Sequence, residues 1–188
     1  MPNVYYKGQG GLLDVEVHPD FPENNYIYVS YSQPKKGKAF TAVARAKLIR
    51  NQLEDFEIIY STEYKHYSRK TVHFGSRFAI SGDYLFFSIG DRGERDEAQD
   101  LDKPNGKIHR LHLDGRVPSD NPFKSKNGDV STIWCYGNRN PQGLAFSKEG
   151  VLWESEHGPR GGDELNIIEK GLNYGWPKIT YGINYIGT

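Results

Sequence analysis

The segment 76–93, SRFAISGDYLFFSIGDRG, decides the fold of this chain. It opens with a short apolar run, turns at Gly82-Asp83 and continues into the aromatic run Tyr84–Ile89. Aromatic and β-branched side chains favour strands, and a Gly-Asp pair between two such runs is typical of a tight hairpin. The segment therefore predicts two antiparallel strands, followed by a polar loop that starts near Asp91.

The same design occurs once before and once after this segment. Segments 12–32, LLDVEVHPDFPENNYIYVSYS, and 142–159, QGLAFSKEGVLWESEHGP, each pass from a strand through a turn into an aromatic strand. Val15, Phe78 and Phe146 hold equivalent places, 63 and 68 residues apart. Four-stranded units repeated at this spacing are typical of β-propeller blades with long loops between strands.

The chain is therefore predicted to be all-β, a partial β-propeller domain over residues 1–188 with about three four-stranded blades. A propeller usually closes with about four to eight blades, and an open arc leaves strand edges unpaired. We expect the chain to be an internal piece of a larger propeller. Helical alternatives are disfavoured by the 21 Gly and 10 Pro residues and by the scarcity of apolar residues at helical spacing.

The composition limits the possible partners. The 24 Lys and Arg residues balance 24 Asp and Glu residues, so a net charge of zero gives no global attraction to nucleic acid or an anionic membrane. The single Cys135 excludes an intramolecular disulfide and a thiolate metal cluster. No apolar run approaches the roughly 18 residues of a membrane-spanning helix. The first residues show no signal peptide.

The loops after the strands carry three unusual runs, which are GNRNPQG at 137–143, EHGPRGGDELN at 156–166 and NYGWP at 173–177. An HFGSR run at 73–77 precedes them. In this order the runs resemble the soluble quinoprotein sugar dehydrogenases, the family of soluble glucose dehydrogenase and aldose sugar dehydrogenase. The resemblance covers essentially the whole chain. It is closest to the aldose sugar dehydrogenase branch, because the loop over 91–106 is short.

The resemblance implies a six-bladed β-propeller that uses pyrroloquinoline quinone (PQQ) and calcium. It implies a quinoprotein oxidoreductase that oxidises an aldose sugar at C1 to the lactone and passes the hydride to PQQ. A small-molecule sugar and an external electron acceptor are the expected partners. The family works outside the cytoplasm, so we expect a periplasmic or secreted protein. The separate chain is expected to be inactive, because further blades would supply part of the pocket.

His73 is the expected catalytic base. The C1 hydroxyl must lose a proton as the hydride leaves, and imidazole titrates near neutral pH. By resemblance, the histidine of the HFGSR run has this role, with Ser76 standing where the family usually has a second glycine. Asp91 matches a family carboxylate that orients the base and stabilises its charge. From the residues alone, a packing histidine and a plain Gly-Asp turn remain alternatives.

The resemblance also assigns residues to the cofactor. Arg139 and Asn140 match the pair that faces PQQ, where a fixed cation would stabilise the negative charge that grows on the quinone oxygens. Gln9 matches a glutamine that binds PQQ, and Tyr185 matches a tyrosine that lines the same pocket. Without the resemblance, Arg139 could instead pair with a carboxylate and tie two blades together.

The loop over 156–164 is expected to bind calcium. It holds three acids, three glycines and a proline, and calcium prefers oxygen ligands that include backbone carbonyls. By resemblance, the carbonyls of Gly158 and Pro159 hold the calcium that bridges to PQQ. Glu164 and the carbonyl of Tyr174 match a second, structural calcium. The loop is no EF-hand, so a turn-rich loop with solvated acids is the alternative without the resemblance.

Two other functions are compatible with acids and histidines on a calcium-binding propeller. A lactonase-type hydrolase would use the metal to activate water. A non-catalytic extracellular propeller would act as a binding module. The joint presence of His73, Arg139 and Asn140 favours the dehydrogenase, because a binding module needs neither a base nor a quinone-facing cation.

Overall fold

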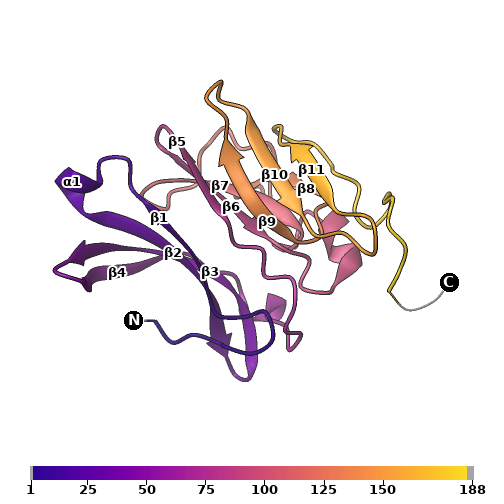
Figure 1. Ribbon diagram of the computed structural model, residues 1–188, viewed down its shortest axis with the longest axis horizontal. Helices are drawn as coiled ribbons and strands as arrows, with labels where there is room; N and C mark the ends of the chain where they lie inside the picture. The colour runs from indigo at the N-terminus through magenta and orange to yellow at the C-terminus, as the bar shows by residue number, and fades with distance from the viewer. Residues whose placement is uncertain (1, 186–188) are drawn as a thin grey trace.

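The computed structural model describes residues 2–185, which form an all-β arc of three antiparallel sheets (Figure 1). In each sheet every strand is hydrogen-bonded to the next one along the chain. The first sheet consists of β1 (Leu12–Val17), β2 (Tyr26–Lys35), β3 (Lys38–Ile49) and β4 (Gln52–Tyr60). The second consists of β5 (Phe78–Ser81), β6 (Tyr84–Ile89), β7 (Lys107–His112) and β8 (Ile133–Tyr136). The third consists of β9 (Pro141–Phe146), β10 (Leu152–Glu156) and β11 (Glu164–Ile167).

Helical structure in the described residues is limited to three short segments, which are α1 (Phe21–Asn24), η1 (Tyr64–His66) and η2 (Arg95–Gln99). Two of them interrupt the connections between strands on the side of the arc that carries the predicted site residues. Across residues 2–185, no helix has the length and apolar character needed to cross a membrane.

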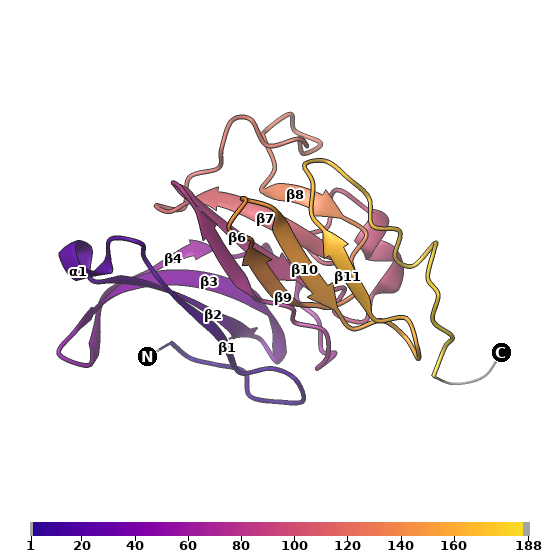
Figure 2. The ribbon, with the colours of Figure 1, turned by 45° about the horizontal axis from the view of Figure 1, so that its top comes forward.

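The three sheets are blades of a β-propeller, so the all-β propeller expected from the sequence is confirmed. Figure 2 shows them following one another around the arc. The first strands of successive blades lie next to each other, because β5 contacts both β1 and β9. The hairpins β1–β2, β5–β6 and β9–β10 correspond to the three repeated segments of the sequence.

The third blade corrects one expectation. The sequence predicts four-stranded blades, but within residues 2–185 this blade has three strands. The predicted loop over 156–164 also ends early, because Glu164 belongs to β11 and pairs with Glu156 of β10. β5 is equally short, but a tight turn and an aromatic run follow it, whereas β11 follows a polar loop and its hydrogen-bond partners lie on β10.

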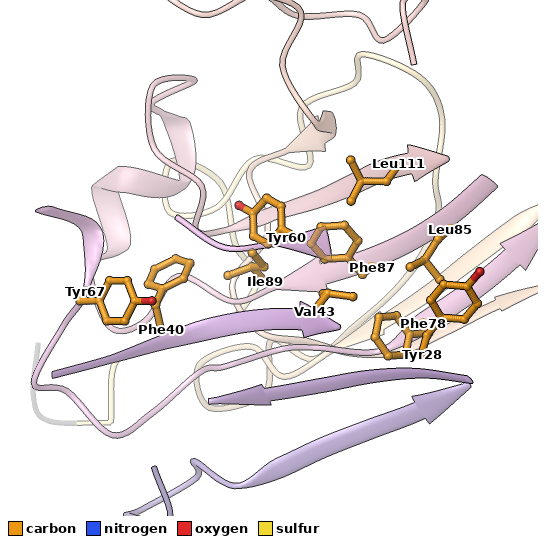
Figure 3. Packing of buried hydrophobic residues seen from close by; sticks show 10 residues of the cluster. All are labelled: Tyr28, Phe40, Val43, Tyr60, Tyr67, Phe78, Leu85, Phe87, Ile89 and Leu111. Atoms are coloured by element: carbon orange, nitrogen blue, oxygen red, sulfur yellow. The ribbon is translucent and has the colours of Figure 1, made fainter. Parts of the chain in front are cut away.

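The hydrophobic core lies between neighbouring blades. Side chains of the first and second sheets pack together in one cluster (Figure 3). Within it, Phe87 contacts Tyr60 edge-to-face, with ring centroids 4.8 Å apart, and stacks on His109 at 5.0 Å. A second cluster, which includes Ile108 and Leu152, joins the second and third blades. Burial between the sheets fixes the relative position of the blades and of the loops that they carry.

The topology gathers the candidate site residues at one rim of the arc. In an antiparallel blade, alternate connections emerge on the same side. The connections β4–β5, β6–β7, β8–β9 and β10–β11 therefore share a rim (Figure 1). They carry residues 61–77, 90–106, 137–140 and 157–163. Runs that are far apart in the sequence are thereby brought side by side.

We expect Phe87→Ala to lower the free energy of unfolding by about 3–5 kcal/mol, because a fully buried ring would leave a cavity between two blades. Phe56→Ala removes the same atoms from a residue that is 36% exposed, so its cost should stay below about 2 kcal/mol. Urea denaturation followed by tryptophan fluorescence measures both values. Equal losses for the two variants would contradict this placement of the core.

Candidate functional site

His73 lies on an irregular turn between β4 and β5. His73, Gly75 and Ser76 have left-handed backbone conformations, with φ of 53°, 62° and 82°. Two side chains from elsewhere in the chain hold this turn. The His73 N–H donates to Gln9 Oε1 at 2.6 Å, and the Gly75 N–H donates to Asn140 Oδ1 at 3.2 Å. Two of the predicted cofactor residues therefore also fix the turn that carries the predicted base.

Close packing restricts the residue types that this turn can use. A side chain at Gly75 would place its Cβ 2.7 Å from the backbone nitrogen of Gly90. At Ser76 the left-handed conformation costs about 1–2 kcal/mol. The Ser76 hydroxyl offsets part of this cost, because it donates to the Phe74 carbonyl at 2.7 Å and lies 3.2 Å from the Thr41 hydroxyl. Ser76 thus keeps a conformation that glycine adopts more readily than other residues.

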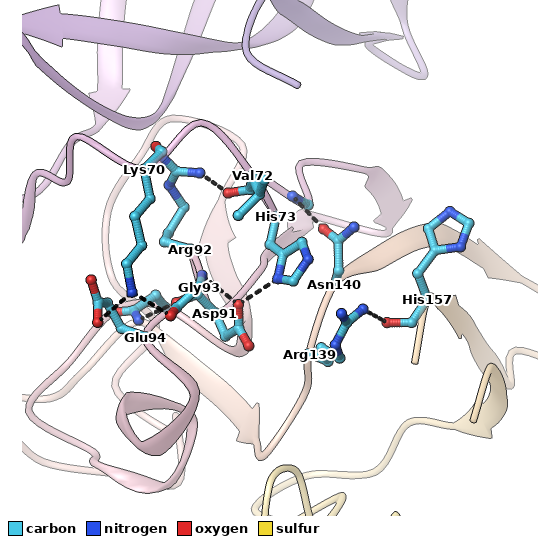
Figure 4. Close-up of polar contacts among 12 residues, drawn as sticks. Lys70, Val72, His73, Asp91, Arg92, Gly93, Glu94, Arg139, Asn140 and His157 are labelled. Atoms are coloured by element: carbon cyan, nitrogen blue, oxygen red, sulfur yellow. Dashed lines mark hydrogen bonds and ion pairs between the residues drawn. The ribbon is translucent and has the colours of Figure 1, made fainter. Parts of the chain in front are cut away.

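Asp91 is a buried partner of His73. Its Oδ1 atom lies 2.7 Å from His73 Nδ1 (Figure 4), and its side chain is 0% exposed against 16% for His73. Oδ1 also accepts the Gly93 N–H at 2.6 Å, and Oδ2 accepts the indole N–H of Trp176 at 2.8 Å. Burial by itself raises the pKa of Asp91, but these three donors stabilise the carboxylate and hold its pKa below the ordinary value.

This geometry prepares His73 to accept a proton. An ionised carboxylate only accepts hydrogen bonds, so the hydrogen-bond network assigns the imidazole proton to Nδ1. In the neutral form of the ring, Nε2 then carries a lone pair, and the ring lines an open pocket. The pair can therefore perform general-base chemistry, in which Asp91 stabilises the imidazolium that forms.

Arg139 lines the same pocket and is held at its backbone and its side chain. The N–H groups of Arg139 and Asn140 both donate to Glu156 Oε2, the second at 2.9 Å. The guanidinium donates to the His157 carbonyl at 2.7 Å and lies 5.3 Å from the ring of Trp176. A cation fixed in this way can stabilise negative charge on a bound ligand.

A pair of buried carboxylates on β10 supports the Arg139 turn. Glu154 and Glu156 project from the same face of the strand, because they are two residues apart. Burial raises the pKa of both carboxyls, and at Glu154 the charge of Glu156 raises it further. Asn166 donates to Glu154 at 3.0 Å. Glu156 is thus a structural anchor that reaches the site through two backbone N–H groups.

Two adjoining pockets bring the predicted catalytic and cofactor residues together. The larger has a volume of about 450 Å³ and is lined by Gln9, His73, Arg139, Asn140, Gln142, His157 and Tyr185. The smaller, of about 170 Å³, shares His73, Arg139 and Tyr185 with it and is also lined by Asp91, Gly93, Arg95, Pro159, Trp176 and Asn184. The structure thus places the predicted catalytic and cofactor residues close together, and the role of each one stays a prediction.

The first pair of predicted calcium ligands lies at the edge of these pockets. The Gly158 carbonyl accepts the Tyr185 hydroxyl at 3.3 Å, and the Pro159 carbonyl accepts the Gly162 N–H at 2.8 Å. Each carbonyl oxygen has a second lone pair, so neither bond prevents the oxygen from ligating a cation. A Cβ at Gly158 would lie 1.7 Å from the Gly162 carbonyl oxygen, so the tight turn requires glycine there.

The second pair of predicted calcium ligands is not brought together by any recorded contact within residues 2–185. The Glu164 carboxylate accepts the Asn166 amide at 3.2 Å. The Tyr174 hydroxyl donates to the Ile167 carbonyl at 2.6 Å, while its ring packs near the core of the second and third blades. Among the described residues, no cluster of three or more His, Cys, Asp or Glu side chains has a metal-binding arrangement. A calcium ion bound by these residues would need further oxygen ligands from backbone carbonyls, from water or from a bound molecule.

Sequence reasoning assigns no role to Trp176 or Glu156. Trp176 lies in the NYGWP run and Glu156 opens the EHGP run, so the unusual runs were the available signal. Trp176 contacts Asp91 across 85 residues, and Glu156 contacts the Arg139 backbone across 17. Local patterns carry no information on contacts at such separations.

Comparisons with known proteins show the family of the chain. Residues 1–188 match the family described as Glucose / Sorbosone dehydrogenase. The chain is 47% identical to aldose sugar dehydrogenase YliI of Escherichia coli, over 100% of this chain and 51% of that protein. It is 38% identical to quinoprotein glucose dehydrogenase B of Acinetobacter calcoaceticus, over 92% of this chain and 41% of that protein.

The fold comparison gives the same result. The structure of the PQQ-bound form of aldose sugar dehydrogenase from Streptomyces coelicolor matches with a TM-score of 0.83 and 30% identity. The match covers 95% of this chain and 51% of that one. The chain thus spans about half the length of the curated relatives it matches.

We expect Asp91→Asn to lower the free energy of unfolding at pH 7 by about 1–3 kcal/mol, because a buried charged hydrogen-bond acceptor is lost. Since folding depresses the pKa of Asp91, its stabilising contribution is complete above the ordinary pKa of 3.8 and is lost as the pH falls through the folded-state value. The gap between wild type and variant should therefore narrow below about pH 4. Denaturant melts at pH 7, 5 and 3 measure it.

The control for this prediction is Asp96→Asn, which changes an exposed carboxylate in the same connection. Its effect should stay within about 0.5 kcal/mol. A stability gap for Asp91→Asn that is the same at all three pH values would show that the Asp91 charge contributes nothing.

Proposed function

The chain belongs to the glucose/sorbosone dehydrogenase family, and from this premise we propose that the complete protein oxidises an aldose sugar at C1 to its lactone, with hydride transfer to PQQ. The observation that carries the proposal is the 2.7 Å contact between His73 and Asp91, on a pocket that Arg139 also lines. Alcohol oxidation needs a base for the hydroxyl proton and a cation where negative charge grows.

The donor set of the pocket fits an oxygen-rich, anionic cofactor such as PQQ. The side-chain oxygens of Gln9 and Asn140 are occupied by the N–H groups of the His73 turn. Among residues 2–185, neither amide nitrogen has a recorded partner, so both can donate to a ligand. The Arg139 guanidinium adds a cation beside them. Gln9, Arg139, Asn140 and Tyr185 would hold PQQ, which supplies the hydride acceptor when bound.

His73 carries out the proton transfer in this proposal. Asp91 holds the Nδ1 proton, so the lone pair of Nε2 is the group that takes the proton from the C1 hydroxyl. The imidazolium that results is stabilised by the adjacent carboxylate. Because Asp91 is itself fixed by Gly93 and Trp176, the ring keeps its orientation through the transfer.

Arg139 has an electrostatic role. Its guanidinium is anchored on the His157 carbonyl, so it offers a preorganised charge to the ligand. Such a charge needs no rearrangement as negative charge develops. An external electron acceptor completes the redox balance, since each sugar oxidised at C1 releases two electrons.

We also propose calcium binding by the carbonyls of Gly158 and Pro159. Pro159 lines the smaller pocket with His73 and Arg139, so a cation there would lie beside the cofactor site. Oxygen ligands from a tight, glycine-containing turn suit calcium. Glu164 and the Tyr174 carbonyl are proposed for the second calcium on the family resemblance alone.

In the complete protein, His73→Ala is expected to lower kcat by about 10²–10⁴-fold while PQQ binding changes little, because only the chemical step loses its base. Arg139→Ala should weaken both PQQ binding and turnover. Dye reduction with glucose and other aldoses measures turnover, and titration of the apoprotein with PQQ measures binding. Near wild-type turnover in His73→Ala would refute the mechanism, and turnover without PQQ would refute the proposed dependence on PQQ.

Calcium should raise the melting temperature of the complete protein relative to a chelator, with stabilisation that grows as the logarithm of free calcium. Thermal melts at a series of buffered calcium concentrations test this expectation. Magnesium serves as the control, because it demands a stricter octahedral geometry and gives up water reluctantly. Identical melting temperatures in calcium and in chelator would contradict the proposal for both calcium sites.

A further inference from the structure

We propose that Arg92 is the positioning residue that holds His73 in place. Arg92 follows Asp91 directly on the β6–β7 connection, and its side chain is buried, with 1% exposure for the residue. Figure 4 shows its guanidinium against the backbone of the segment that carries His73. Nothing in the proton-transfer scheme assigns Arg92 a role. The inference rests on the proposed function, because it requires His73 to be the base.

The guanidinium of Arg92 contacts residues on both sides of His73. Nη2 donates to the Lys70 carbonyl at 2.7 Å, and Nη1 donates to the Val72 carbonyl. The guanidinium lies over the ring of Phe74, with Cζ 3.4 Å from the ring centroid. A fork that bonds two carbonyls and stacks on a ring defines a direction as well as a distance. Arg92 therefore holds the chain on the N-terminal side of His73 through two carbonyls and on its C-terminal side through the Phe74 ring.

The His73 segment also donates to the β6–β7 connection, through the side chain of Lys70. The Lys70 ammonium donates to the Gly93 carbonyl at 2.6 Å and pairs with Glu94 at 2.9 Å. Asp91, which accepts from the imidazole, thus lies within a short stretch that is bonded to the His73 segment at several points. The adjacent residues Asp91 and Arg92 supply the carboxylate and the guanidinium that holds the His73 segment, which we call the clamp. If the β6–β7 connection shifts, both move together, so the distance between His73 Nδ1 and Asp91 Oδ1 is preserved.

The need for a clamp comes from backbone strain. His73 has φ of 53°, a left-handed conformation that costs about 1–2 kcal/mol for a residue other than glycine. Without external bonds, this residue would relax and carry its ring away from Asp91. Gln9 bonds the His73 N–H, and Arg92 bonds the carbonyl of the residue before it. Together they hold the peptide group that enters the strained residue.

A purely space-filling role would not favour arginine here. Burying a guanidinium is costly, and an apolar side chain of similar size fills space without that cost. The Arg92 Nε has no recorded partner among the described residues, so part of its desolvation is left uncompensated. Burial lowers the pKa of Arg92 to about 9, so the group is still charged at neutral pH. The advantage of arginine at this position is its directional contact with the His73 segment.

The test replaces Arg92 in the complete protein and follows His73 directly. In Arg92→Gln, we expect the hydrogen-bonded Nδ1–H resonance of His73 to shift or broaden in proton–nitrogen NMR spectra. The resonance is assigned by its loss in His73→Gln. We expect kcat to fall by about 10- to 100-fold, because a base displaced by about 1 Å loses that much rate, while KM changes little. Arg92→Lys, which keeps a positive charge but lacks the planar fork, should give intermediate values.

Arg110→Gln is the matched control. Arg110 is also buried, bonds Asp120 at 2.5 Å and Asn121 at 2.7 Å, and stacks on Trp134 at 4.3 Å, but it lines neither pocket of the site. It should lower the melting temperature without moving the His73 resonance. The proposal is overturned if Arg92→Gln behaves in the same way, with an unchanged resonance and kcat within about twofold of wild type.

Two further outcomes separate this inference from the proposed function. If both Arg92 variants unfold where Arg110→Gln stays folded, Arg92 is a folding residue and the positioning role is wrong. If His73→Ala keeps its turnover, His73 is not the base, and a residue that positions His73 has no effect on catalysis. The NMR spectra still report in that case whether Arg92 orients the His73 ring.

Discussion

A carboxylate shielded from water needs hydrogen-bond donors from the protein, and Asp91 is the carboxylate on which the candidate site depends. Its oxygens collect one donor from His73, one from the Gly93 backbone and one from the Trp176 indole. His73 lies in the β4–β5 connection, Gly93 in the β6–β7 connection with Asp91 itself, and Trp176 in the segment that follows β11. The requirement to neutralise one desolvated charge therefore joins the loops of neighbouring blades and orients the imidazole at the same time.

Backbone strain is the second constraint. The turn over 73–76 is left-handed at three of its four positions, and it packs so closely on Gly90 that a Cβ there would lie 2.4 Å from the His73 carbonyl oxygen. Hydrogen bonds from the turn's N–H groups to the side-chain oxygens of Gln9 and Asn140 compensate part of the strain. Ligand-facing residues thus also carry the structure of the turn, and strain of this kind is common where a protein fixes reactive groups in advance.

The two halves of the pocket are built by the same device. Asp91 orients His73 through its side chain, and Glu156 orients Arg139 through its backbone. In both cases a buried acid lies behind the residue that faces the ligand. The acids differ in their ionisation, since donors hold the pKa of Asp91 down while burial raises that of Glu156. Asp91 therefore stays ionised more readily than Glu156 as the pH falls.

The sequence by itself determined the all-β class, the repeat and the positions of most strands, because alternation and turn residues are local signals. Through its unusual runs it also indicated the residues that share a pocket, including His73, Arg139 and Asn140. Only the tertiary structure decided which groups touch: Trp176 on Asp91, Glu156 under Arg139, Arg92 against the Lys70 and Val72 carbonyls. It also decided β11, whose four residues become a strand beside β10. These contacts depend on burial and on hydrogen-bond partners from distant residues, and no run of neighbouring residues specifies either one.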